Sequence, residues 1–289
     1  MIVSAQIDAH LRRLTPAERR VAAVVADDPE AVAFGTVADV ARRAGASGAT
    51  VVRLATKLGF DGFVELQAAV REDITRRLRP ASERIRRPAP GDVLGTALAT
   101  EMANVAATLE GVDRAAFDRA VRLLSGAAEE GGRRRGSGRA LILSGDASSG
   151  VASLFAAELS MLRPGVVLVG GSEVRVARLL ADVGPSDVVV VIDLARYDRA
   201  VLDAAGRAPE RGATLVALTD SALSPLAATA TVTLTASVTG AGPFDSHVGL
   251  LALANALLAG AAARLRRSAT DRLDQVEAAW RTAEALTDG

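Results

Sequence analysis

Five short apolar runs in the second half of the chain constrain its fold most strongly. Each is rich in β-branched or other aliphatic residues, which is typical of strands buried on both faces of a sheet. Helical stretches separate most of them, as parallel strands require. The runs are RALILSG (139–145), GVVLVGG (165–171), DVVVVID (187–193), ATLVALTD (213–220) and ATVTLTA (230–236). They predict an α/β domain with three layers and a doubly wound parallel sheet.

The first third of the chain has a helical pattern instead. Thr15 precedes Pro16 and stands three residues before Glu18. A threonine that accepts from the third helical N–H, with a glutamate that reaches back, forms a capping box, and proline is favoured at the first helical position. The sequence therefore predicts a helix that begins at Pro16.

Two short helices are expected next, over residues 36–45 and 47–59, with Gly45 in the sharp turn between them. A positive φ at this turn suits glycine, and Ala41 fits where two helices cross closely. This spacing predicts an all-α helix-turn-helix domain. Its inward-facing residues are expected to be Val40, Ala44, Ala46, Val51 and Leu54.

The second of these helices presents a candidate surface for double-stranded DNA. Its N-terminal part would enter the major groove, where Ser47, Ala49 and Thr50 would face phosphates or base edges. Arg53 would bond guanine in bidentate fashion, and Lys57 would reach a backbone phosphate. The alternative is a plain helical hairpin in which Arg53 and Lys57 are solvated.

Composition narrows the chemistry. The chain contains no cysteine, which excludes disulfides, thiolate catalysis and cysteine-bound metal. The formal net charge is zero, but residues 1–87 carry an excess of four positive charges and the remainder an excess of four negative charges. The longest apolar run, 249–263, contains Asn255 and falls short of the roughly 20 residues that span a bilayer. We expect a cytoplasmic protein without a membrane partner.

The pattern suggests four parts. We expect a helix-turn-helix domain over 1–78, a linker and connecting helix over 79–112, an α/β domain over 113–267 and a C-terminal helix over 268–289. The linker contains three prolines and a cluster of arginines. Because reading DNA with two-fold symmetry needs two copies, we expect a homodimer or tetramer that forms through the C-terminal part.

Three motifs in the first domain resemble those of the RpiR-type transcriptional regulators. They are LTPAERR (14–20), the Ser-x-x-Thr-Val-Val-Arg run from Ser47 to Arg53, and KLGFDGF (57–63). In that family a sugar isomerase (SIS) domain follows, and residues 113–265 are similar to one. The resemblance implies a regulator that binds an operator and senses a phosphosugar through its SIS domain.

The resemblance also implies an effector site at the C-terminal ends of the strands, as the rule for open α/β sheets does. The loop SGDASSGVA carries Ser148 and Ser149, and Ser149 matches the family's serine. The segment LTDSALSPLA matches the family at Thr219 and Ser224. These residues predict a site for a small anionic metabolite such as a sugar phosphate or sugar acid.

One loop departs from the family pattern. The family usually has Ser-x-Ser-Gly-x-Thr after the third strand, where this chain reads IDLARYDRA (192–200). Arg196 could bind an anion in place of the missing hydroxyls. His247 stands where an arginine is common, and either faces the pocket or is a helix-terminus residue without a ligand role.

Two alternatives remain open for the effector domain. It could be a structural dimerisation module that binds no ligand, which the IDLARYDRA loop makes credible. It could also be a sugar-phosphate isomerase, which needs a base such as Glu158 or Glu173. Neither glutamate is paired with a recognisable acid, so we expect no catalytic residue, no metal and no cofactor.

Overall fold

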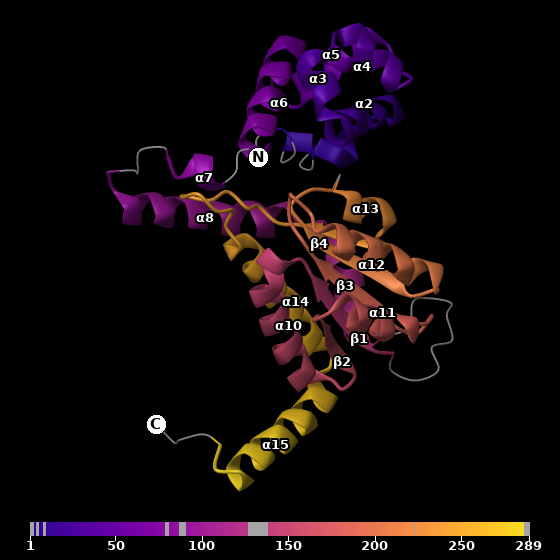
Figure 1. The fold of residues 1–289 in the computed structure, drawn as a ribbon, viewed down its shortest axis with the longest axis vertical. Coiled ribbons are helices and arrows are strands. Elements are labelled where there is room, and N and C mark those ends of the chain that lie inside the picture. Colours follow the sequence, from indigo (N-terminus) through magenta and orange to yellow (C-terminus); the bar gives the residue numbers. More distant parts are fainter. Residues whose placement is uncertain are drawn as a thin grey trace. The chain divides into compact units, whose positions relative to one another are not determined.

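Figure 1 shows the fold in a computed structural model that describes residues 3, 6–7, 10–78, 81–86, 91–126, 138–222 and 224–285. The chain divides into two compact units. The first comprises Met1–Gly111, Asp220–Ala228 and Thr235–Gly249, and the second comprises Val112–Thr219, Thr229–Leu234 and Leu250–Gly289. The domain boundaries drawn from the sequence, at residues 78, 112 and 267, stay a prediction.

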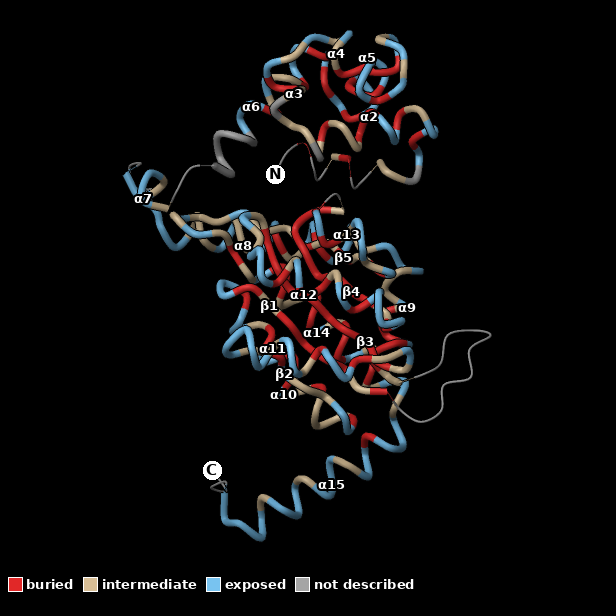
Figure 2. The backbone as a smooth tube through the Cα atoms, turned by 45° about the vertical axis from the view of Figure 1, so that its right-hand side comes forward, coloured by how far each residue is buried: buried red, intermediate tan, exposed pale blue. Residues whose placement is uncertain are grey.

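The N-terminal part of the first unit is helical. Its elements are η1 (Leu11–Arg13), α2 (Pro16–Asp27), α3 (Pro29–Phe34), α4 (Val37–Arg43), α5 (Gly48–Lys57) and α6 (Phe63–Leu78). Their apolar faces form one core, in which Val21, Val51, Leu54 and Leu66 are fully buried. Figure 2 shows this core in red inside a pale, exposed surface. Burial of these side chains is the main source of stability for such short helices.

Two capping boxes start the helices that define this region. Thr15 Oγ1 accepts from the Glu18 amide at 3.3 Å, and Glu18 Oε2 accepts from the Thr15 amide at 2.8 Å. Thr36 and Asp39 form the same arrangement before α4. Each box satisfies two backbone N–H groups that the helix itself leaves without partners. The predicted start of α2 at Pro16 is confirmed.

The turn between α4 and α5 has the expected conformation. Gly45 adopts a φ of +55°, and the Ala46 amide donates to the Ala41 carbonyl at 2.9 Å. Four of the five residues predicted to face inward are buried, and Ala46 is half-buried. The helix-turn-helix geometry predicted from the spacing is therefore confirmed.

The first unit also contains α7 (Ala81–Arg84), α8 (Val93–Gly111) and the segment 235–249. Asn104 on α8 is 1% exposed and satisfies its whole amide group. It donates to Glu101 Oε2 and to the Thr239 carbonyl, and it accepts from Ser237 Oγ and the Thr239 amide. A buried and fully bonded amide of this kind fixes one register between the helix and the segment.

The second unit is built on a five-stranded sheet with the order β2-β1-β3-β4-β5. All the strands run parallel, and Leu141 on β1 pairs with Val167 on one side and Val189 on the other. Residues on β1, β3 and β4 are almost all buried, because helices cover both faces. The strands are β1 (Ala140–Ser144), β2 (Val166–Val169), β3 (Val188–Ile192), β4 (Thr214–Thr219) and β5 (Val232–Thr235).

Helices form the outer layers around this sheet. In Figure 1, α10 and α14 lie on one side of it, and α11 and α12 lie on the other. The predicted three-layer, doubly wound class is confirmed. The helices and short turns after α8 are α9 (Arg114–Leu124), η2 (Asp146–Ser148), α10 (Ser149–Leu162), α11 (Glu173–Ala181), α12 (Arg199–Glu210), α13 (Pro225–Thr229), α14 (Val248–Arg264) and α15 (Arg266–Thr282).

In the part of the chain that the structure describes, no single helix has the length and apolar composition of a membrane span. The helices α14 and α15 reach both only when taken together, and the chain bends by 103° between them.

Candidate functional site

The first candidate surface lies on α5. Ser47 caps this helix, and its Oγ accepts from the Thr50 amide at 3.3 Å. Ser47, Ala49 and Arg53 are exposed together on one side, as expected, whereas Thr50 is 6% exposed. Arg53 donates to Thr50 Oγ1 at 3.3 Å and pairs with no carboxylate among the described residues. The Thr50 hydroxyl thus holds one N–H group of the Arg53 guanidinium, and the other N–H groups stay available to a bound partner molecule.

Lys57 has a partner that sequence reasoning missed. Its Nζ donates to Glu18 Oε2 at 2.7 Å and to the Arg13 carbonyl at 3.3 Å. The Glu18 side chain is only 7% exposed, and the Lys57 side chain is 40% exposed. The hydrogen bond from Lys57 and the backbone bond from Thr15 lower the pKa of Glu18. Lys57 therefore joins α5 to the first turn of α2.

Arg20 holds the turn of the helix-turn-helix. Its Nε donates to the Ala44 carbonyl and one terminal nitrogen to the Gly45 carbonyl, both at 3.0 Å. These two carbonyls stand at the end of α4, where a helix leaves acceptors without intrahelical partners. The LTPAERR segment is the sequence signal for both interactions. It places Glu18 and Arg20 on the part of α2 that faces α5 and the turn.

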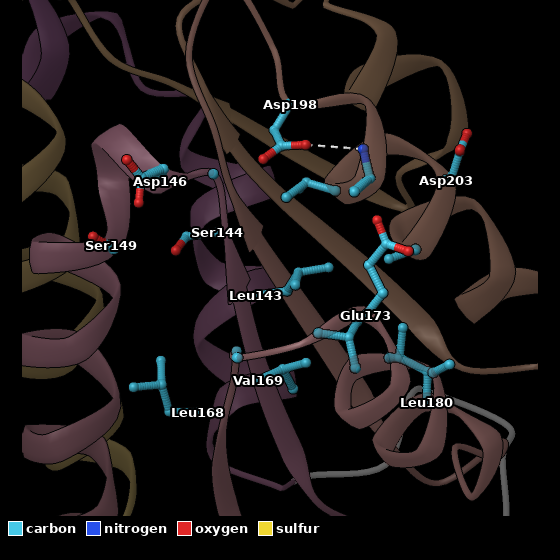
Figure 3. Close-up of a pocket in the computed structure, with 18 of the residues that line it drawn as sticks. Leu143, Ser144, Asp146, Ser149, Leu168, Val169, Glu173, Leu180, Asp198 and Asp203 are labelled. Carbon is cyan, nitrogen blue, oxygen red and sulfur yellow. Dashed lines mark hydrogen bonds between the residues drawn. The ribbon is translucent and has the colours of Figure 1, made fainter.

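The second candidate is a pocket of about 640 Å³ in the second unit. It opens beside the carboxyl ends of β1 and β2 and is bordered by the beginnings of α10, α11 and α12 (Figure 3). Leu143, Val169 and Leu180 supply apolar walls. Gly170 and Gly171 form the turn after β2, where Gly171 has a φ of +96°. The volume of the pocket lies within the range of sites that bind small molecules.

Negatively charged side chains predominate around this pocket. Asp146, Glu173, Asp198 and Asp203 line it, and Arg207 is the single cation among its lining residues. Figure 3 shows the Glu173 side chain extending from the start of α11 toward the pocket interior. Asp198 caps α12 and accepts from the Ala200 amide at 2.9 Å. Such a lining favours hydroxyl or amine groups, which donate to carboxylates, over anions.

The residues expected to bind the effector lie in different places. Ser149 is exposed and lines the pocket, whereas Ser148 and Thr219 are fully buried and do not. Arg196 is exposed, has a φ of +71° and is absent from the pocket lining. Two further residues belong to the first unit: these are Ser224, which is buried and bonds the Ala227 amide, and His247, which is half-buried before α14.

The departing loop after β3 is organised around Asp193. This residue is 5% exposed, and its two carboxylate oxygens accept from the amides of Leu194 and Asp198 at 2.9 and 2.8 Å. Gly145 at the end of β1 packs directly against it, since a Cβ there would lie 2.3 Å from Asp193 Oδ1. Sequence reasoning noticed the departure but did not foresee that this carboxylate would be an internal acceptor.

Among the described residues, no group of three or more histidine, aspartate or glutamate side chains has an arrangement that could hold a metal ion.

Comparisons with known families match both parts of the chain. Residues 1–77 match a helix-turn-helix domain described as belonging to the rpiR family, and residues 135–260 match the SIS domain. A comparison with curated protein sequences gave no match.

Several solved structures are similar to this one, and two of them are described here. The sugar isomerase domain of an RpiR transcription factor from Sphaerobacter thermophilus is 29% identical, with a TM-score of 0.58; the match covers 64% of this chain and 99% of that one. The NanR protein of Vibrio vulnificus, complexed with ManNAc-6P, is 21% identical, also with a TM-score of 0.58; the match covers 97% of this chain and 98% of that one. The second likeness spans both domains at the level of the fold.

Proposed function

We propose that this chain is a transcriptional regulator that responds to a small sugar derivative. The premise is that it belongs with the RpiR-type proteins, which join an rpiR-family helix-turn-helix domain to a SIS domain. Such a regulator acts on the chromosome, so we expect it in the cytoplasm.

The observation that carries the DNA-binding role is the exposed side of α5. Ser47, Ala49 and Arg53 lie together at the N-terminal part of this helix, directly after the Gly45 turn. That part of the second helix reads base edges in a helix-turn-helix, and an arginine there suits guanine. We assign base contact to Arg53 and phosphate contact to Ser47. Thr50 and Lys57 support that surface, and Lys57 keeps enough exposure to approach a phosphate.

The sensing role is supported by the pocket in the SIS domain and by the ligand of the NanR structure, which is a phosphorylated amino sugar. We propose a sugar derivative as the ligand class and Ser149 as the serine that contacts it. Ser148 and Thr219 would act as buried supports of the neighbouring loops. Direct ligand roles for Arg196, Ser224 and His247 remain proposals, and so does a phosphate or carboxylate on the ligand.

Self-association is part of the proposal, because an operator with two-fold symmetry is read by two copies. The helix α8 carries apolar side chains that are open to solvent in the single chain. Leu94, Leu98 and Met102 are 84%, 63% and 64% exposed and lie four residues apart along one face. We propose that a second copy covers this face.

An aldose–ketose isomerase is the second candidate, because Glu173 lines the pocket and could act as a base. Prolonged incubation with sugar phosphates, followed by NMR in deuterium oxide, tests it. Deuterium incorporation next to the carbonyl, lost in Glu173→Gln, would favour the enzyme. An unchanged substrate would favour the regulator.

The regulator is tested by footprinting on the DNA upstream of its own gene, at low salt and with Arg53→Ala as control. A protected segment that this variant loses supports the proposal. Thermal melting in the presence of sugar derivatives tests the sensing role separately, since a ligand at one hundred times its dissociation constant adds about 2.7 kcal/mol of stability. Loss of either result removes the corresponding half of the proposal.

A further inference from the structure

The carboxyl ends of β1 and β3 form the switch point of the sheet. From β1 the chain crosses to β2 on one side, and β3 lies on the other side of β1. Open α/β sheets bind ligands in the crevice outside the strand ends at such a point. Here the two strands end at Ser144 and Ile192, so the crevice begins at Gly145 and Asp193.

Asp193 fills this position with a negative group that belongs to the chain itself. Each of its carboxylate oxygens accepts a backbone N–H, from Leu194 and from Asp198. An ionised carboxylate is purely an acceptor, so it suits two N–H donors. These loop amides are the kind of donor that would otherwise hold a phosphate oxygen. Both are engaged by a side chain that is 5% exposed.

The neighbouring residue at the end of β1 fits this arrangement closely. Gly145 leaves room for the carboxylate, because any Cβ at residue 145 would lie 2.3 Å from Asp193 Oδ1. Gly145 and Asp198 both line the pocket, so Asp193 stands immediately behind its wall. A phosphate placed in the crevice would meet a like charge at short range, in addition to the carboxylates that line the pocket.

We infer that Asp193 is a specificity residue that acts as a built-in anion at the switch point, and that the pocket beside it takes a sugar derivative without a phosphate group. The inference rests on the proposed sensing role and refines its ligand class. Hydroxyl groups of such a ligand would donate to the carboxylates around the pocket. The anionic ligand expected from the family resemblance would be the one that this chain excludes.

The test is calorimetric titration of the full-length chain with three probes: inorganic phosphate, glucose 6-phosphate and glucose. The wild type is compared with Asp193→Ser, which removes the charge and leaves a hydroxyl, and with Asp193→Asn, which keeps most of the shape. The matched control is Asp203→Ser, which removes one negative charge from the pocket wall and leaves the β3–α12 loop amides bonded to Asp193. Thermal melting establishes which variants fold.

We expect Asp193→Ser to bind inorganic phosphate and glucose 6-phosphate at least about tenfold more tightly than the wild type, since it removes a like charge and frees two N–H donors. Asp203→Ser should change these affinities by less than Asp193→Ser does. If Asp193→Ser does not fold, Asp193→Asn takes its place, with the same expected direction.

Two outcomes would overturn the inference. One is a wild type that binds glucose 6-phosphate more tightly than glucose. The other is a folded Asp193 variant that gains no affinity for phosphate. Footprinting on operator DNA is independent of both, so the regulator could stand while this inference falls. Conversely, a gain of phosphate affinity in a chain that protects no DNA would support the role of Asp193 and count against the regulator.

Discussion

Lys57 Nζ lies 2.7 Å from Glu18 Oε2, so an ion pair joins the end of the candidate recognition helix to the start of α2. Glu18 is buried and also closes the capping box with Thr15. One carboxylate therefore fixes both where α2 begins and how α5 sits against it. The basic residue that the sequence suggested for a DNA phosphate is thus first a structural residue of the domain.

Breaking this pair should weaken the fold. Lys57→Met and Glu18→Gln should each lower the free energy of unfolding by about 1–2 kcal/mol, since Glu18 is buried but Lys57 is partly exposed to solvent. The double variant should lose less than the sum, with a coupling of about 1 kcal/mol. Urea denaturation of the four proteins measures this, and additive losses would show that the two residues do not act together.

The pair also predicts a dependence on acid. The pKa of Glu18 is lowered from its ordinary value of 4.5, and Thr36 and Arg42 lower the pKa of Asp39 to about 2. A carboxyl with a lowered folded pKa contributes full stability above its unfolded pKa and loses it as the pH falls through the folded value. Stability should therefore decline below about pH 4.5. Glu18→Gln should flatten the first part of that decline in melting curves, and an unaltered decline would contradict the assignment.

Arg53 should matter more for DNA than Lys57 does. Arg53→Ala should cost about 1–3 kcal/mol of operator affinity and relax the base preference at one position. Lys57→Met should change the slope of log affinity against log salt by less than the loss of one phosphate contact would, because the Lys57 ammonium is already paired with Glu18. Arg178→Ala, at an exposed arginine of α11, is the control and should leave affinity unchanged. Fluorescence anisotropy at several salt concentrations measures operator affinity and its salt dependence for each of these proteins; an operator affinity of Arg53→Ala equal to that of the wild type would count against a base contact by Arg53.

Blocking the pocket should uncouple sensing from DNA binding. Ala177 on α11 is exposed and lines the pocket, whereas Ala181 on the same helix is exposed and does not. Ala177→Phe should abolish the effect of a sugar derivative on operator affinity and leave affinity without ligand intact, because coupling needs a ligand that distinguishes two states. Ala181→Phe should behave as wild type. An equal loss of response in both variants would place the ligand elsewhere.

Charge on the exposed face of α8 should prevent self-association. Leu98→Asp buries a carboxylate in any interface that this face forms, which costs several kcal/mol unless the charge is paired. Leu273→Asp makes the same change on α15, where Leu273 is 37% exposed. Sedimentation velocity should show monomers for the first variant and wild-type dimers for the second. The reverse result would move the interface to the C-terminal helix.

The sequence predicted the architecture well because local signals and burial agree. The capping residues Thr15 and Thr36, the turn at Gly45 and the β-branched strands each specify one local structure, and tertiary packing opposes none of them. These features needed no information about distant residues.

The candidate sites were less predictable, because they depend on contacts between residues far apart in sequence. Glu18 and Lys57 are 39 positions apart, and no pattern within α5 indicates that its lysine is paired. In the sequence, Asp193 only marked the absence of the family's serine hydroxyls from this loop. The register of β1 and β3 is what places its carboxylate against Gly145. The sequence suggested Arg196 as a replacement anion ligand, but the residue is exposed and is absent from the pocket lining.

Selection of bound fragments from random duplex DNA, with the full-length wild-type chain and with Arg53→Ala in parallel, tests the central claim most directly. We predict that the wild type enriches a sequence with two-fold symmetry, with half-sites centred about 10 base pairs or a multiple of that apart. The variant should lose preference at one position of each half-site. Fragments that remain as random as the starting pool at low salt would contradict a regulatory role for this protein.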